Sequence, residues 1–226
     1  PWFNPQWKEQ PPTAIGQALS GLALPEPNPF IASDLTLQGG QDEQPTALIE
    51  TPTFTAWHMQ DSRFNTPSVE WRVSLQHPSA SYSAEEAVLT RLLAGWLNDS
   101  LNESLYPAWI AGQSFSAYAH ARGMTLSFSG WRDGQTPLIE QALEQLQQAD
   151  ISTGAFERVR YQLQREWRNA PQASLTGQAS RALGEALLTP QWSTAELLEA
   201  SQRLEKRHLE NFRRRFLDDL YIAAMA

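Results

Sequence analysis

The chain has 226 residues, a formal net charge of −8 at pH 7 and no cysteine. Its length and its 41% of hydrophobic residues, which include nine Trp and nine Phe, indicate a folded chain with a sizeable core and exclude a disordered one. The acidic balance argues against nucleic-acid and anionic-membrane partners, and the lack of cysteine excludes disulfides and thiolate metal sites.

Residues 1–45 form a proline-rich arm that holds eight of the fifteen prolines. Proline fixes φ and lacks an N–H donor, so we expect an extended or turn-rich arm with at most one short helix near residues 13–22. Either the arm packs on its own domain, which we favour, or it is a linker that docks on a neighbouring domain. Both interpretations rest on the apolar aromatic residues Trp2, Phe3, Trp7 and Phe30.

Residues 46–226 are predicted to form a single α+β domain, in which an antiparallel sheet is backed by helices. Three strands are expected first, at residues 47–51, 54–60 and 68–76. In the last of them apolar residues alternate with polar ones, as in a strand that has one wet face.

The organising stretch of this domain runs from Ser83 to Asp133. Ser83 and Glu86 have the spacing of a capping box, and apolar residues then recur every three or four positions as far as Leu105, which predicts one long amphipathic helix. The period then falls to two over residues 115–121 and 124–128, which predicts a hairpin that turns at Arg122-Gly123. The helix is expected to lie across the sheet.

The rest of the chain is predicted to be helical. Thr136-Pro137 is expected to cap one helix, and residues 156–167 and 175–187 to form two more. A second capping box, Ser193 with Glu196, opens a helical region that extends to Leu220. The inward positions of the 175–187 helix are expected to be Leu175, Ala179, Ala182, Ala186 and Leu187. The final apolar run, residues 219–226, resembles the entry to a strand. Such a run would be unfavourably exposed to solvent at a natural C-terminus, so we expect that the domain is truncated there.

The sequence contains no convincing active site, so we predict no catalytic residue, no metal ligand and no resident cofactor. The four histidines His58, His77, His120 and His208 lack metal-ligand spacing, although His58 and His120 could meet across the sheet. Asp99 and Glu103 have helical i,i+4 spacing, and the neighbouring Asn98 and Asn102 suggest bonding to a nearby loop. We interpret both carboxylates as part of a solvated helix face.

Two further patterns also favour structural interpretations. Ser114 and Ser129 lack the surroundings of a nucleophile elbow. The run Arg213-Arg214-Arg215 is offset by nearby acidic residues and is interpreted as a solvated face in preference to an anion site or a domain interface. No apolar run reaches the ~20 residues that span a bilayer, so we expect a soluble protein, and its lack of cysteine fits cytoplasm and periplasm equally.

Two segments, Trp57–Leu75 and Leu97–Asp133, resemble the pitrilysin/insulinase family of zinc metallopeptidases, and specifically the third of four homologous domains in its long bacterial members. Ala23–Leu35 resembles the segment that begins their C-terminal half. A peptidase of coenzyme-PQQ synthesis is a related possibility. The residues that carry the match are Trp57, Asp61, Phe64, Pro67, Asn102, Glu103, Tyr106, Ala111, Gly112, Gly123, Ser129 and Gly130.

The resemblance implies an α/β roll of the LuxS/MPP-like metallopeptidase type, within a chamber that degrades peptides. It also implies that zinc belongs to the first domain of a longer parent protein, held by an inverted H-x-x-E-H helix whose counterpart here lacks that motif. The predicted function is therefore a non-catalytic domain that forms part of the chamber wall and helps bind peptides. Its expected partners are the parent's other domains. The alternative is an independent interaction module that uses the arm or a sheet edge.

Overall fold

The computed structural model describes residue 6, residues 8–9 and residues 26–226. The short helix expected near residues 13–22 lies outside these residues. Six strands of the described chain form one sheet in the order β1-β2-β6-β3-β5-β4. All neighbouring strands are antiparallel except β2 and β6, which run parallel. The strands are β1 (Thr46–Glu50), β2 (Phe54–His58), β3 (Ser68–Gln76), β4 (Ser114–His120), β5 (Gly123–Trp131) and β6 (Tyr221–Met225).

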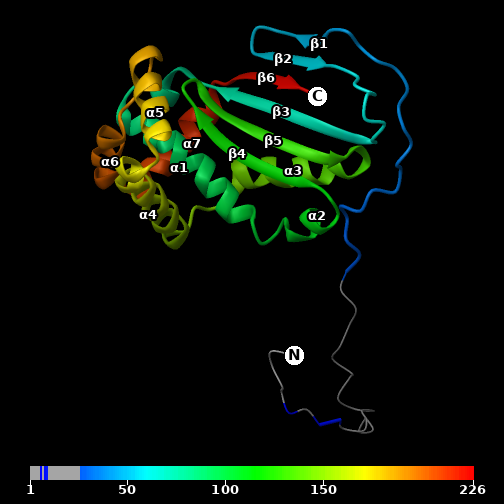
Figure 1. Ribbon diagram of the computed structural model, residues 1–226, viewed down its shortest axis with the longest axis horizontal. Coiled ribbons are helices and arrows are strands. Elements are labelled where there is room, and N and C mark those ends of the chain that lie inside the picture. The colour runs from blue at the N-terminus through cyan, green and yellow to red at the C-terminus, as the bar shows by residue number, and fades with distance from the viewer. Residues whose placement is uncertain (1–5, 7, 10–25) are drawn as a thin grey trace.

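The helices cover one face of this sheet, whereas the other face carries exposed polar side chains such as Glu70 and Arg72 (Figure 1). This arrangement confirms the predicted α+β class and the wet face of the third strand. The helices are α1 (Ala84–Leu101), α2 (Tyr106–Ile110), α3 (Gln135–Gln148), α4 (Thr153–Asn169), α5 (Leu175–Leu187), α6 (Thr194–Arg203) and α7 (Lys206–Asp218). Short 3-10 turns occur at η1 (Pro78–Ser81), η2 (Arg132–Gly134) and η3 (Ala170–Gln172). None of the helices in the described part is long and apolar enough to cross a membrane.

Helix α1 is the centre of the core, and it is buried on nearly every side rather than along the single stripe that the sequence predicts. It contacts the sheet through β4 and β5, and it also contacts α3, α4, α6 and α7. A Cβ at Gly95 would lie 2.6 Å from Cγ1 of Val159, so glycine permits the close approach of α1 and α4. The most buried large side chains of the core include Leu92, Leu93, Trp96, Leu97, Phe128, Phe212 and Phe216.

Helix α1 also differs from its prediction at both ends. It ends at Leu101 rather than Leu105, and a turn separates it from the short α2. At its start the Ser83 hydroxyl accepts from the Glu86 N–H, but the Glu86 carboxylate accepts from Arg215 at 2.6 Å and does not complete the capping box. Burial raises the pKa of Glu86, and the Arg215 charge partly offsets that rise.

Three further expectations need correction. Helix α3 begins at Gln135 after Gly134, so Thr136 does not cap it. The predicted helical region after Ser193 is two helices separated at Leu204 and Glu205, although its capping box is present. The apolar residues expected to face inward on α5 are all exposed, and none of the residues of that helix is buried.

The C-terminal apolar run forms β6, as its sequence predicts, but it is not left unpaired. Strand β6 lies between β2 and β3 and pairs with both of them. Its residue Ala224 is 6% exposed. The premise that this run would stay unpaired is therefore wrong, whereas the predicted extent of the domain, including the boundary at residue 45 and the C-terminal truncation, stays a prediction.

Candidate functional site

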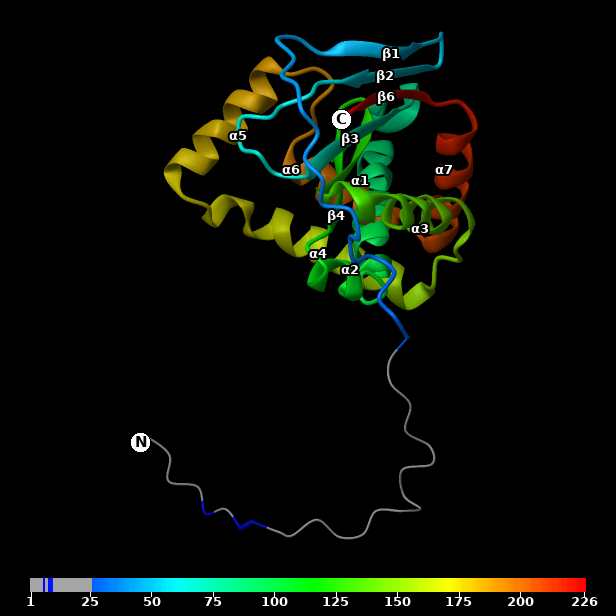
Figure 2. The same cartoon turned by 90° about the vertical axis from the view of Figure 1, so that its right-hand side faces the viewer.

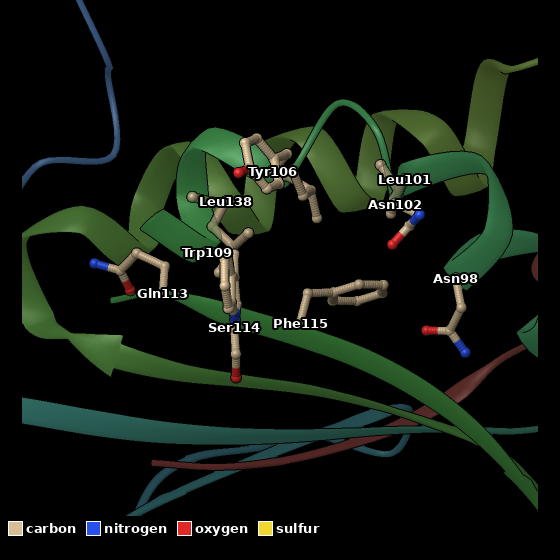
Figure 3. A pocket seen from close by; sticks show the side chains of 11 residues that line it. Asn98, Leu101, Asn102, Tyr106, Trp109, Gln113, Ser114, Phe115 and Leu138 are labelled. Atoms are coloured by element: carbon tan, nitrogen blue, oxygen red, sulfur yellow. The ribbon is translucent and has the colours of Figure 1, made fainter. Parts of the chain in front are cut away.

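The end of α1, the short helix α2 and the edge strand β4 enclose a hollow of about 360 Å³, here called the α2 hollow. Figure 3 shows Phe115 of β4 between Trp109 of α2 on one side and Asn98 and Asn102, near the end of α1, on the other. No acidic or basic side chain is among its lining residues. They are Asn98, Leu101, Asn102, Leu105, Tyr106, Ala108, Trp109, Gln113, Ser114, Phe115 and Leu138.

Helix α2 forms an aromatic ledge beside this hollow. Pro107 stands in its first turn, where the fixed φ of proline suits a helix start and the missing N–H is not needed. One turn of helix then places the rings of Tyr106 and Trp109 in a stacked arrangement, with their centroids 5.9 Å apart. Both rings remain exposed, at 58% and 68%, and so does Ile110 at 62%. The ledge therefore offers apolar surface that the described residues leave uncovered.

The polar groups around the hollow are largely used by the fold itself. The Asn98 amide donates to the Ala117 carbonyl at 2.7 Å, and its oxygen accepts from the Ala117 N–H at 2.8 Å. Asn98 thus bonds to the strand β4 and not to a loop. It pairs with both backbone polar groups of Ala117, the middle residue of this edge strand. Gln113, which is 1% exposed, donates to the Trp131 carbonyl and accepts from Gln135.

A second hollow, of about 470 Å³, lies around the loop that joins β2 to β3. Hydrogen bonds from the Arg63 side chain and from its backbone N–H to Asp61 stabilise this loop and lower the pKa of the Asp61 carboxyl to about 2. Phe64 is 79% exposed beside them. The residues of this hollow that also carry the family resemblance are Asp61, Phe64, Pro67, Ser129 and Gly130. The fold therefore gathers much of the resemblance at two places on the surface.

The structure does not bring the histidines together. His58 is on β2 and His120 on β4, with three strands between them, so roughly 19 Å of sheet separates the two, and the contact that the sequence left open does not form. His77 accepts from the Ser79 N–H at the start of η1, and His208 accepts from the Glu205 N–H at the start of α7. Burial lowers the pKa of His120, whose ring contacts the Ser74 hydroxyl.

The carboxylates and arginines singled out in the sequence also make contacts within the domain. Asp99 accepts from Arg158 of α4 at 2.7 Å, whereas Glu103 lies beyond the end of α1, so the two do not share a helix. Arg213 donates to the Ala149 carbonyl, and Arg215 pairs with Glu86. Two of the three consecutive arginines thus connect α7 to other helices.

The described residues do not fit a resident zinc ion. No group of three or more His, Cys, Asp or Glu side chains in the described part of the chain could hold a metal. Ser114 and Ser129 bond to each other through their hydroxyls at 2.8 Å on neighbouring strands. The α2 hollow can bind an apolar group. Its lining residues include no acidic or basic side chain and no nucleophile paired with a base.

Comparison with known families decides which family this is. The family described as the middle or third domain of peptidase M16 matches residues 2–200. The chain belongs to the peptidase M16 family. Insulin-degrading enzyme of Drosophila melanogaster is 26% identical over 203 residues, which are 88% of this chain and 20% of that protein. The peroxisomal insulin-degrading enzyme-like 1 of Arabidopsis thaliana is 27% identical over 193 residues, which are 84% of this chain and 20% of that protein.

Among solved structures, the crystal structure of pitrilysin matches with a TM-score of 0.80 over 91% of this chain and 22% of that one. At 18% identity this likeness shows the fold, and it agrees with the roll that the sequence resemblance implies. This M16 chain spans about a fifth of the length of these relatives.

Proposed function

We propose that this M16 domain is a non-catalytic part of a zinc metalloendopeptidase, in which it forms part of the wall of a peptide-degrading chamber and helps to bind peptides. The proposal is supported by membership of the family and by the lack of a metal-ligand group among the described residues. The observation that carries the binding role is the α2 hollow, an uncharged recess with an aromatic ledge that the described residues leave exposed.

The α2 hollow has a size and a lining suited to an apolar side chain of an extended peptide. Its volume of about 360 Å³ falls within the range of roughly 300–1,000 Å³ of ligand sites, which are mostly apolar. A side chain inserted beside Phe115 would lie next to Tyr106 and Trp109, which line the same hollow. Such contacts orient a peptide and hold it near the reacting groups, which raises their effective concentration. The zinc and the cleavage chemistry belong, in this proposal, to the parent's first domain.

The first prediction concerns metal and activity. Calorimetric titration of the chain with zinc is expected to show no tight one-to-one binding, and incubation with peptides is expected to show no cleavage, because the described residues offer no metal-ligand group. The full-length parent, which should bind zinc and cleave peptides, is the positive control. Stoichiometric zinc binding or turnover by the chain would contradict the non-catalytic assignment.

The second prediction concerns peptide binding. In the full-length parent, Trp109→Ala is expected to raise KM about fivefold with kcat nearly unchanged, because loss of an aromatic contact is worth about 1 kcal/mol of uniform binding. The side chain is 68% exposed, so the fold should persist. The matched control is Tyr161→Ala on α4, an exposed aromatic residue, 59% accessible, that does not line the hollow. An unchanged KM for the Trp109 variant would show that the α2 hollow does not contribute to peptide binding.

The alternative function, an interaction module, is favoured by one edge of the sheet. Strand β1 is an edge strand with Leu48 65% exposed, whereas the other edge, β4, is occupied by Asn98. A partner strand would therefore add to β1. Leu48→Lys should abolish capture of such a partner while leaving peptide cleavage by the parent unchanged. Unchanged capture together with impaired cleavage would instead favour the chamber-wall function.

A further inference from the structure

Helix α5 exposes the face that its sequence marks for burial. Six apolar residues recur at steps of three, four and one, the spacing that forms one continuous stripe on a helix. Leu175 is 84% exposed, Leu183 59% and Leu187 71%. Figures 1 and 2 place α5 at the outer end of the helices α4 to α6, away from the sheet. This outward stripe, here called the α5 face, consists of Leu175, Ala179, Ala182, Leu183, Ala186 and Leu187.

The opposite side of α5 is held to the domain by polar groups. Gln178 donates to the carbonyls of Pro171 and Ala173, at 3.0 and 2.8 Å, and Arg181 donates to the Ala170 carbonyl at 2.9 Å. The Ser174 hydroxyl caps the first turn by accepting from the Gly177 N–H. These bonds tie the first half of α5 to the residues that immediately precede it, and the hydrogen-bonding side chains lie on the side of the helix away from its leucines.

The composition of the α5 face indicates a permanent cover. It carries no charged residue, although the chain has a net charge of −8. Permanent interfaces are apolar like a domain core, whereas transient ones keep a more polar surface. Its alanines also leave room for a close neighbour between the leucines. A cover that is always present is most simply a segment of the same polypeptide, and the M16 relatives are more than four times as long as this chain.

We infer that the α5 face is the docking surface for another domain of the same M16 polypeptide, which covers it with an apolar helix or sheet face. This inference rests on the proposed function, since it takes the chain to be one domain of a longer peptidase. The α5 face differs from the α2 hollow in that a neighbouring domain covers it permanently, so peptides do not bind to it.

The test measures how accessible the α5 face is in the chain and in the full-length parent. The chain has no cysteine, so Leu183→Cys adds one thiol, whose labelling by a maleimide can be followed by peptide mass spectrometry. In the parent, labelling is expected to be at least about tenfold slower than in the chain, because a docked domain protects the thiol. The control is Gln147→Cys on α3, an exposed position, whose rate in each protein normalises the comparison. Circular dichroism checks that the variants fold.

Equal normalised rates in chain and parent would overturn the inference. Protection that is already present in the chain and increases with its concentration would also overturn it, because a second copy would then be the cover. The peptide-binding role is judged separately by the Trp109→Ala variant. If Trp109→Ala raises KM as expected but the thiol at position 183 is labelled equally fast in chain and parent, only the docking surface is rejected.

Discussion

Replacing Phe30 with alanine is expected to lower the free energy of unfolding by about 3–5 kcal/mol, the usual cost of deleting a buried phenylalanine. Phe30 belongs to the irregular segment that precedes β1, yet it is only 4% exposed and packs in the main core. Urea denaturation of the chain and its Phe30→Ala variant measures the difference directly. A large loss would mean that the last part of the proline-rich arm contributes to the stability of the domain.

The neighbouring residue provides the matched control. Ile31 is 65% exposed, so Ile31→Ala should change the free energy of unfolding by less than about 0.5 kcal/mol. If the two variants were equally mild, residues 26–45 would be a surface linker, and Phe30 would not belong to the core. The pair therefore separates the two interpretations of the arm for its described part.

The contacts of this segment support the expected loss. Asn28 donates to the Pro107 carbonyl of α2 at 2.8 Å. The Asp133 carboxylate accepts from the backbone N–H groups of Ser33 and Asp34, which lowers the pKa of Asp133. Removal of residues 1–35, as a test of the arm as an interaction module, would thus also remove a core residue, Phe30. A deletion that ends at residue 25 keeps Asn28 and Phe30.

Local patterns in the sequence predicted most of the elements, because period and capping act over a few residues. Strand β3 lies at its predicted residues, and Ser193 with Glu196 forms the predicted capping box. Partners distant in sequence could not be predicted in the same way. The insertion of β6 between β2 and β3 joins segments more than 140 residues apart, and neither strand's pattern identifies the other.

The difference is clearest for α5 and for the candidate site. The spacing of leucines and alanines in α5 identifies which residues share a face, but it cannot tell whether the same domain covers that face. At the α2 hollow, Tyr106 was marked only by its resemblance to the family. The bonds of Asn98 to Ala117 depend on how α1 lies against β4, which is a tertiary property with no local signal.

The largest single-residue effect on the sheet is expected at Gly123, where alanine should lower the free energy of unfolding by roughly 3 kcal/mol or more, from strain and overlap together. The sequence marks Gly123 as part of a hairpin turn. The structure adds a second constraint, since φ is +157° and an added Cβ would lie 1.9 Å from the Leu75 carbonyl oxygen of β3. That backbone atom is in the sheet and cannot move aside as a flexible side chain could.

The control for this variant is Gly39→Ala, where an added Cβ meets no atom within 4 Å, so the free energy of unfolding should change by less than about 0.5 kcal/mol. Urea denaturation of both variants measures the contrast. If Gly123→Ala were equally mild, the hairpin could move away from β3 at little cost. Since β5 joins β4 to β3, such freedom would also move Phe115 relative to α1 and loosen the α2 hollow. A severe loss would instead tie the geometry of that hollow to the pairing of β3 with β5.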